Sequence, residues 1–186
     1  MTAYPREELE EMVERWIQAN KDAEEAGDWK SMAELYTEDA TYGWNYGPHT
    51  DFMAVGREEI REFALGEEMA GLDGWEYPYE EIVIDETKGM VIGLWRQIAD
   101  AKREDGSRYE IAGIGGSWFI YGGNFQWRWQ RDWFDFGNAA TLFMDMMSAG
   151  VLSDGMIGRM NRSMRSDLPG YYPHGKAPLN LWDGRA

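Results

Sequence analysis

The sequence contains no cysteine and only two histidines among its 186 residues. Without cysteine, the chain has no disulfide, no zinc–thiolate site and no cysteine nucleophile. His49 follows a proline and His174 lies near the C-terminal end, and neither has a second potential ligand at the spacing of metal-binding motifs. We therefore expect no metal site.

Basic residues are also scarce, since 18 Lys and Arg stand against 34 Asp and Glu and give a formal net charge of −16. Such a charge argues against nucleic acid and against anionic membrane surfaces as partners. It also slows the approach of anionic substrates. A neutral or cationic small molecule is therefore the better expected ligand.

Long apolar runs are absent, and no stretch approaches the length that spans a membrane. The first eleven residues are polar and acidic, unlike a secretory signal peptide. These two features predict a cytoplasmic protein with no membrane partner.

Apolar and aromatic residues are plentiful. Hydrophobic residues make up 44% of the chain, which is enough for the core of one domain of this length. Ten Trp, ten Tyr and seven Phe supply large rings, and twelve Met supply flexible apolar side chains. Methionine fills irregular space well, so this composition favours an irregular apolar cavity.

Helical periodicity dominates the N-terminal part of the chain. A helix is predicted from Pro5 to the residue before Gly27, with an apolar stripe that includes Met12 and Trp16. After it we expect, in chain order, a short helix capped by Asp28, a strand at about 40–44, a long loop over 45–55 and a helix from Gly56.

After Gly74 the apolar period changes from helical to two. Strands are predicted at about 75–84, 90–101, 108–121 and 124–136. Turn residues separate them, which indicates successive antiparallel hairpins. Helices followed by such a meander are typical of the α+β class.

Two further helices are predicted after the last strand, capped by Asn138 and Ser153. Their methionines, which include Met156, Met160 and Met164, belong to the core, to an interface or to a lid over a cavity. The remaining tail from Leu168 is rich in Pro, Gly and aromatic residues, and we expect it to be ordered by docking.

The last predicted strand carries charged groups among large rings. Strict alternation places Trp127, Trp129, Arg131, Trp133 and Asp135 on one face and Arg128, Gln130, Asp132 and Phe134 on the other. A carboxylate among aromatic rings is costly unless it is paired or hydrogen-bonded, and its pKa shifts easily. Asp132 is therefore either a candidate general base or one half of a structural pair with an arginine.

Several short motifs resemble the nuclear transport factor 2 superfamily in their order along the chain. They are Trp16, Gly27-Asp28-Trp29, Glu38-Asp39-Ala40, Gly56-Arg57-Glu58-Glu59-Ile60 and Arg131-Asp132-Trp133-Phe134-Asp135. The resemblance implies a cone-shaped, strongly curved antiparallel sheet with N-terminal helices around an apolar pocket. It also implies a domain over residues 1–137, with 138–186 as a C-terminal helical extension packed on it.

Within that superfamily the chain most resembles the limonene-1,2-epoxide hydrolases and the SnoaL-like polyketide cyclases. The resemblance implies that Asp132 is the catalytic aspartate, Arg96 its arginine partner and Tyr42 a hydrogen-bond donor. Trp44 occupies the position of a water-binding asparagine, and Asn45 follows it. The tyrosine and the asparagine position the attacking water in those hydrolases.

The chain departs from the hydrolases at their second aspartate, which protonates the epoxide oxygen. Ile98 holds that position here, and Asp100 is the alternative acid two residues later. Relatives that use an Asp–His pair would require His49 to turn inward. The residues expected to contact substrate are Trp44, Asn45, Ile98, Gln130, Phe134 and Tyr36.

Two functions remain open at this point. The first is a cofactor-free enzyme that acts on a neutral apolar terpenoid, steroid or polyketide through Asp132, by epoxide hydrolysis, isomerisation, dehydration or cyclisation. The second is a non-catalytic protein that binds an apolar ligand, or an assembly subunit. The sheet face with Trp129 and Trp133 predicts a homodimer, since an exposed indole-rich face favours aggregation.

Overall fold

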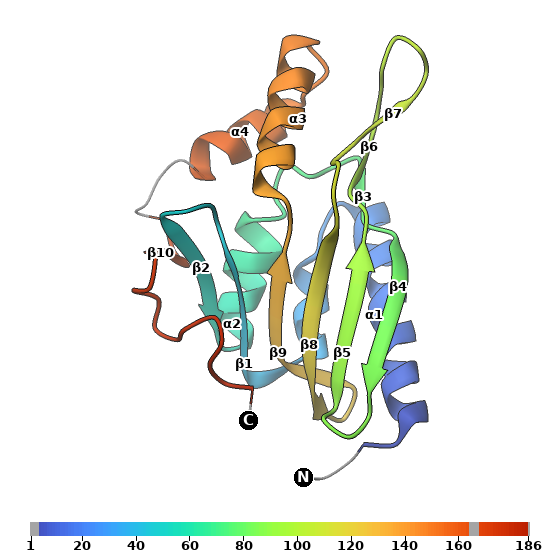
Figure 1. The fold of residues 1–186 in the computed structure, drawn as a ribbon, viewed down its shortest axis with the longest axis vertical. Coiled ribbons are helices and arrows are strands. Elements are labelled where there is room, and N and C mark those ends of the chain that lie inside the picture. Colours follow the sequence, from blue (N-terminus) through green and yellow to red (C-terminus); the bar gives the residue numbers. More distant parts are fainter. Residues whose placement is uncertain (1–3, 164–167, 186) are drawn as a thin grey trace.

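The computed structural model describes residues 4–163 and 168–185, and it has an α+β architecture (Figure 1). A seven-stranded sheet runs in the order β10-β2-β1-β9-β8-β5-β4, and a three-stranded sheet in the order β3-β6-β7 lies at one end of it. The large sheet is curved and is not closed into a barrel. All pairs between neighbouring strands are antiparallel except β1 with β9, which are parallel.

The helices that precede the meander cover one face of the large sheet (Figure 1). They are α1 (Arg6–Ala26), η1 (Lys30–Leu35), α2 (Arg57–Glu59) and the π-helical η2 (Ile60–Glu67). α1 begins after Pro5 and ends at Gly27, whose φ of 64° is the left-handed conformation that glycine adopts without strain. Its buried residues, including Met12 and Trp16, pack on the sheet in one apolar core.

The strands of the large sheet are β1 (Tyr36–Asn45), β2 (Thr50–Val55), β4 (Tyr79–Asp85), β5 (Met90–Trp95), β8 (Gly115–Gly123), β9 (Gln126–Trp133) and β10 (Tyr171–Pro173). The expectation of a loop over 45–55 is wrong, because β2 pairs with β1 in an antiparallel hairpin. Gly47 and Pro48 belong only to the turn of that hairpin. Asp51 obscures the apolar pattern of β2, since it is a buried acidic residue.

Three of the predicted long strands are interrupted. The interruptions leave the short strands β3 (Trp75–Glu76), β6 (Ile98–Lys102) and β7 (Arg108–Glu110), which form the second sheet. Pro78 lies at one break and Arg96 at the facing one, where the Arg96 N–H donates to the Pro78 carbonyl at 3.1 Å. A proline cannot donate to a sheet ladder, so the break at Pro78 has a local cause.

A bulge in β9 changes which face Trp127 occupies. Trp129 pairs with Ile120 of β8, and Trp127 pairs with the next residue, Tyr121, so one extra residue of β9, Arg128, lies between partners of adjacent residues on β8. An extra residue in a strand reverses the alternation beyond it. Trp127 therefore packs against Trp16 and Phe119 in the core, and the expectation that it shares a face with Trp129 is wrong.

The C-terminal helices α3 (Phe136–Ser148) and α4 (Asp154–Ser163) stand at one end of the large sheet (Figure 1). The side chain of Asp135, rather than Asn138, caps α3 by accepting from the Asn138 N–H. Ser153 accepts from the Met156 N–H at 3.1 Å, as expected of a cap. Met164 lies outside the described residues.

The C-terminal tail docks on the molecule in two places. Strand β10 extends the large sheet next to β2, although no strand is predicted there. Farther on, the Asp183 carbonyl accepts from the Trp129 indole at 2.7 Å, and the Leu181 carbonyl accepts from Arg131 at 3.0 Å. Trp129 is fully buried as a result, so the chain itself covers part of the face on which a partner subunit was expected.

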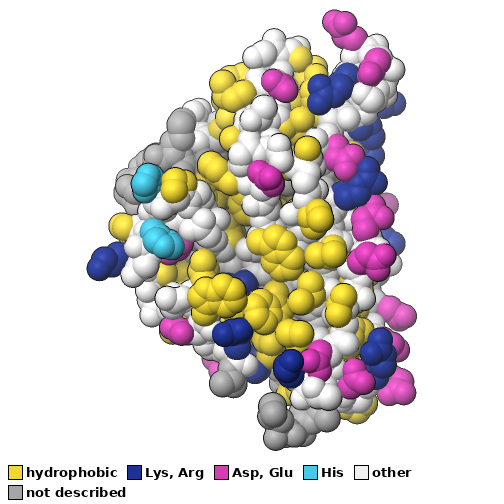
Figure 2. Space-filling view, viewed as in Figure 1, with side chains coloured by type: hydrophobic (Ala, Val, Ile, Leu, Met, Phe, Trp, Pro, Cys, Tyr) yellow, Lys and Arg dark blue, Asp and Glu magenta, His cyan; other side chains and the backbone are white. Residues whose placement is uncertain are grey.

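Apolar side chains gather over the middle of the sheet face that is turned away from the helices (Figure 2). Trp133 on β9 remains 39% exposed and Trp182 in the tail 63% exposed. In the described part of the chain, no helix is long and apolar enough to cross a membrane.

Candidate functional site

A cavity of about 470 Å³ lies between the helix-covered face of the large sheet and the helices η2, α3 and α4. Its volume is within the range of sites for small organic ligands. The wall is predominantly apolar and aromatic, with rings that include Trp16, Trp44, Trp95 and Phe134. A few polar side chains interrupt this wall, and they divide into two groups.

Asp132 belongs to the first group, and the sheet register directs it into the cavity. Trp44 of β1 and Ser117 of β8 flank it as strand neighbours, and both also line the cavity. The carboxylate accepts two hydrogen bonds, from Gln130 Nε2 to Oδ1 at 2.8 Å and from the Tyr42 hydroxyl to Oδ2 at 2.5 Å. Tyr36, behind the wall, donates to Gln130 and so fixes the orientation of that amide.

Burial raises the pKa of Asp132 above its ordinary value. Hydrogen bonds from Gln130, Tyr42 and Ser117, and the charge of Arg131, act in the opposite direction but only partly offset the burial. No ion pair of Asp132 is found among residues 4–163 and 168–185. The carboxylate is therefore held by neutral donors and faces apolar space.

Arg131 is next to Asp132 in sequence but lies on the other face of the sheet. Its guanidinium donates to the carbonyl and the hydroxyl of Thr41 and stacks 4.4 Å from the ring of Trp129. Burial lowers its pKa to about 10. Arg131 thus acts on Asp132 only through the sheet and leaves the cavity side of the carboxylate open.

Tyr79 and Ser117 add hydroxyl groups beside Asp132. The indole of Trp16 donates to the Tyr79 oxygen at 2.9 Å, and the indole of Trp95 donates to the Ser117 oxygen at 3.0 Å. Ser117 also hydrogen-bonds to Asp132 and to Tyr79, so the two hydroxyls join the carboxylate in one polar group. Burial keeps the pKa of Tyr79 well above its ordinary value, so this tyrosine is a neutral donor.

Two glycines make room for these side chains. A Cβ on Gly115 would lie 2.1 Å from the Trp95 ring, and a Cβ on Gly93 would lie 2.3 Å from the Tyr79 ring. The Trp95 and Tyr79 rings therefore lie over glycines of the neighbouring strands, where no side chain blocks them. Both residues line the cavity. Nothing in the sequence pattern singles out Tyr79, Trp95 or Ser117, although glycine within a strand indicates such a close approach.

The structure places half of the expected contact residues, and the expected donor Tyr42, at the cavity. Tyr42, Trp44, Gln130 and Phe134 line the cavity with Asp132. Tyr36 is fully buried behind it and acts through Gln130. The polarity proposed for this end of β9, with 130, 132 and 134 toward the cavity, agrees with this arrangement.

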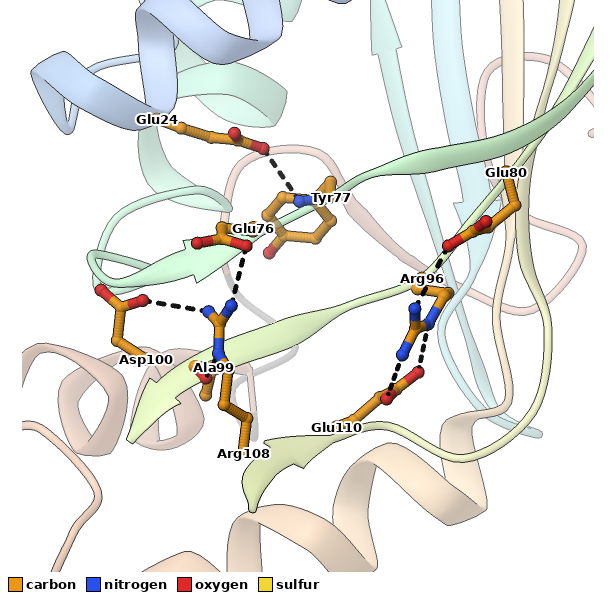
Figure 3. A network of polar contacts seen from close by, with 9 residues as sticks. All are labelled: Glu24, Glu76, Tyr77, Glu80, Arg96, Ala99, Asp100, Arg108 and Glu110. Atoms are coloured by element: carbon orange, nitrogen blue, oxygen red, sulfur yellow. Dashed lines mark hydrogen bonds and ion pairs between the residues drawn. The ribbon is translucent and has the colours of Figure 1, made fainter. Parts of the chain in front are cut away.

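Arg96 does not pair with Asp132, contrary to expectation. It binds both carboxylate oxygens of Glu110 at 2.6 Å and also Glu80 at 3.2 Å, on the outside of the molecule (Figure 3). The cause is the strand alternation, because Trp95 and Gln97 on either side of Arg96 line the cavity. The guanidinium must then point outward.

Ile98, Asp100 and Asn45 also lie outside the cavity. Ile98 is in β6, where its strand neighbours are Glu76 and Glu110. Asp100 is exposed and pairs with Arg108 at 3.0 Å (Figure 3). Because the strand is interrupted at Arg96, Ile98 and Asp100 belong to the second sheet, and Asp100 is not an acid for this site. The Asn45 amide donates to the Asp51 carboxylate.

The two histidines lie near the cavity mouth. His49 is an exposed member of the cavity lining, in the turn between β1 and β2. His174 is 3.0 Å from the carboxylate of Asp51. Among the described residues, no group of three or more His, Cys, Asp and Glu is arranged to hold a metal ion.

The second polar group of the cavity was not expected from the sequence. It consists of Glu68, which follows η2, and Arg159 on α4. Arg159 Nη2 lies 3.3 Å from Glu68 Oε2, and the Tyr171 hydroxyl donates to Oε1. One feature of the sequence could have indicated this group. Arg159 stands three residues after Met156 and next to Met160, so it interrupts an otherwise apolar stripe of the helix.

Comparison with known proteins gives a consistent family. A family model described as a SnoaL-like domain matches residues 13–121, which is more than half of the chain. No curated protein matches the sequence. The match runs from Val13 within α1 through most of β8 and ends before Asp132, α3 and α4.

Several solved structures share the fold. One from Jannaschia sp. CCS1, provisionally described as a SnoaL-like polyketide cyclase, has a TM-score of 0.54 at 14% identity and covers 76% of this chain and 96% of its own. An NTF2-like protein from Anabaena variabilis ATCC 29413 gives 0.53 at 17%, covering 73% and 95%. TerC co-crystallized with polyporic acid gives 0.51 at 13%, covering 73% and 97%.

Proposed function

Because this chain belongs to the SnoaL-like domain family, we propose that it is an enzyme in which Asp132 removes a proton from carbon. The substrate is a neutral, largely apolar molecule of the polyketide, steroid or terpenoid kind. One observation carries the proposal: the Asp132 carboxylate faces an apolar cavity and is held by Gln130 and Tyr42 without a cation. A carboxylate in such a site is a stronger base than in water.

The proposed step begins with a C–H bond next to a carbonyl group. The C–H bond breaks, the proton moves to an Asp132 oxygen, and the electron pair moves into the carbonyl group to form an enolate. Tyr79, which lines the same cavity as a neutral hydroxyl, is the proposed hydrogen-bond donor to the enolate oxygen. In a cyclisation the enolate carbon attacks a second carbonyl, whose π electrons move to its oxygen, and that oxygen takes the proton back from Asp132. In an isomerisation Asp132 returns the proton to another carbon of the conjugated enolate.

Epoxide hydrolysis receives less support from the geometry. That reaction requires a proton for the epoxide oxygen as well as a base for water. The residues expected to assist Asp132 in it, Arg96 and the acid at Ile98 or Asp100, all lie outside the cavity. Enolate chemistry needs one base and one neutral donor, and the described residues provide both.

The test uses a simple carbon acid. In deuterated buffer, 2-tetralone exchanges its α-hydrogens slowly, and proton NMR measures the rate. We expect the protein to accelerate this exchange and Asp132→Asn to lower the protein-dependent rate by about 100-fold or more. Tyr79→Phe should lower it as well.

Arg96→Met is the matched control, because Arg96 lies on the outside of the molecule, and its rate should equal that of the wild type. Equal rates for wild type and Asp132→Asn would rule out the mechanism. The alternative, a protein that binds an apolar ligand without chemistry, predicts 2-tetralone binding with no acceleration at all.

A further inference from the structure

Arg159 comes from α4, outside the matched family domain, and reaches the cavity wall. Two of its nitrogens have structural partners. Nε donates to the Glu68 carbonyl at 2.6 Å, and Nη2 lies 3.3 Å from the Glu68 carboxylate. These two contacts hold α4 against the end of η2.

The third nitrogen, Nη1, differs from the other two in its contacts. Across residues 4–163 and 168–185, the structure contains no hydrogen bond or ion pair of Nη1. It is also absent from the buried, unsatisfied atoms of the described residues, so it keeps some accessible surface, and Arg159 is one of the residues that line the cavity. The guanidinium is planar and fixed by its other two nitrogens, which gives the free donors of Nη1 a set direction.

The guanidinium stays charged in this apolar setting. Burial alone would lower the pKa of Arg159, but the Glu68 carboxylate and the nearby Tyr46, Tyr77 and Tyr171 reverse that effect and raise it. Glu68 itself is only 5% exposed and is bound by Tyr171 as well. The pair is therefore a fixed polar unit with no net charge.

Arg159 and Asp132 occupy separate parts of the cavity. The charge of Asp132 acts on Tyr36, Tyr42 and Tyr79. Glu68, at the end of η2, and Arg159, on α4, act on a second set of tyrosines. A ligand that reaches both groups must carry oxygen at both ends of an apolar body.

We propose that Arg159 Nη1 binds a neutral carbonyl oxygen of the substrate, at the end away from the carbon that Asp132 deprotonates. This inference rests on the proposed function, since it assigns the second end of the same substrate. A neutral oxygen fits better than a carboxylate for two reasons. Glu68 already balances the charge of Arg159, and Asp132 leaves the cavity with a net negative charge.

The test compares two probes that differ in one carbonyl group. They are 2,6-diacetylnaphthalene and 2-acetyl-6-ethylnaphthalene, and binding is followed by tryptophan fluorescence because Trp16, Trp29, Trp44 and Trp95 line the cavity. We expect the second carbonyl to increase affinity about tenfold in the wild type, as a hydrogen bond to a charged donor does.

The main variant is the double change Glu68→Gln with Arg159→Met. Removing both charges avoids a buried, unpaired carboxylate, which would destabilise the fold by itself. The affinity ratio of the two probes should fall close to one in this variant. Arg96→Met, the same substitution at an arginine outside the cavity, should keep the tenfold ratio.

Arg159→Lys provides a second variant that retains the ion pair with Glu68 and therefore the fold. It lacks the free Nη1, so the ratio should fall several-fold. An unchanged ratio in both Arg159 variants would overturn the proposal and leave Arg159 as a structural pin for α4. Tighter binding of 6-acetyl-2-naphthoate than of the diacetyl probe would also overturn it, because the site would then select an anion.

The two proposals fail in different ways. Loss of the probe ratio without any acceleration of 2-tetralone exchange supports the Arg159 contact and contradicts proton abstraction. Acceleration that depends on Asp132, with a probe ratio that is independent of Arg159, contradicts only the Arg159 contact.

Discussion

At the scale of single residues, Asp132 illustrates both what sequence can predict and where it stops. Alternation within one strand places Asp132, Gln130 and Phe134 on a common face, and all three line the cavity. The partner of Asp132 is not predictable in the same way. Arg96 points outward because the alternation along its own strand places it on the outer face. The sequence does not directly show which set of alternating residues on one strand shares a face with which set on another.

Asp132→Asn should change how the stability of the protein depends on pH. Since burial raises the pKa of Asp132, the folded protein binds this proton more tightly than the unfolded chain does. The resulting contribution to stability is complete below the unfolded pKa of about 3.9 and is lost as pH rises through the folded pKa. Asparagine does not ionise, so the variant lacks this pH-dependent loss of stability.

Urea unfolding of both proteins between pH 4 and pH 8 measures the effect. The free energy of unfolding of the variant minus that of the wild type should increase with pH over this range. A difference that is constant, or that decreases with pH, would contradict the raised pKa.

At the scale of elements, the helices and the order of the hairpins are predictable, but the interruptions within strands are not. The helix stop at Gly27 and the caps at Asp135 and Ser153 are local chemistry. The bulge beside Trp127 and the break at Arg96 depend on packing against neighbouring strands. These irregularities decide which residues reach the cavity, so the site is less predictable than the fold.

Gly115→Ala tests how the sheet positions Trp95. The new Cβ would lie 2.1 Å from the indole ring, so the ring must move and its hydrogen bond to Ser117 is lost. Overpacking of this kind costs about 1–3 kcal/mol of unfolding free energy. Urea denaturation measures that cost, and 2-tetralone exchange should slow because the cavity wall changes shape.

Gly137→Ala is the matched control. Gly137 lies in α3 without a positive φ, and the nearest atom to its added Cβ is at 3.5 Å. Its unfolding free energy should stay the same or rise slightly, since alanine favours helix. If the two substitutions have equal effects, the close approach of Trp95 to Gly115 does not matter.

At the scale of the whole molecule, the C-terminal tail completes the outer face of the sheet. Removal of residues 180–186 would take away the carbonyl partners of Trp129 and Arg131 and expose the Trp129 ring. Each buried donor left without a partner costs about 1–3 kcal/mol. We expect a clear fall in the melting temperature, and an unchanged melting curve would show that the tail contributes nothing there.

The homodimer remains a prediction. Apolar side chains cover the middle of the outer sheet face (Figure 2). Trp133 of β9 is 39% exposed. If this face joins two subunits, Trp133→Glu should shift the protein toward monomer in sedimentation equilibrium, because it places a charge in an apolar contact. A mass that does not respond to this substitution argues for another interface or for a monomer.

The central claim is that Asp132 removes a proton from carbon inside the cavity. The pH dependence of 2-tetralone exchange tests it most directly. The protein-dependent rate should rise with pH through a midpoint above the ordinary aspartate pKa of about 3.9, as Asp132 becomes ionised, and the rise should disappear in Asp132→Asn. A rate that is the same from pH 4 to pH 8, or a rise that persists in the variant, would contradict the claim.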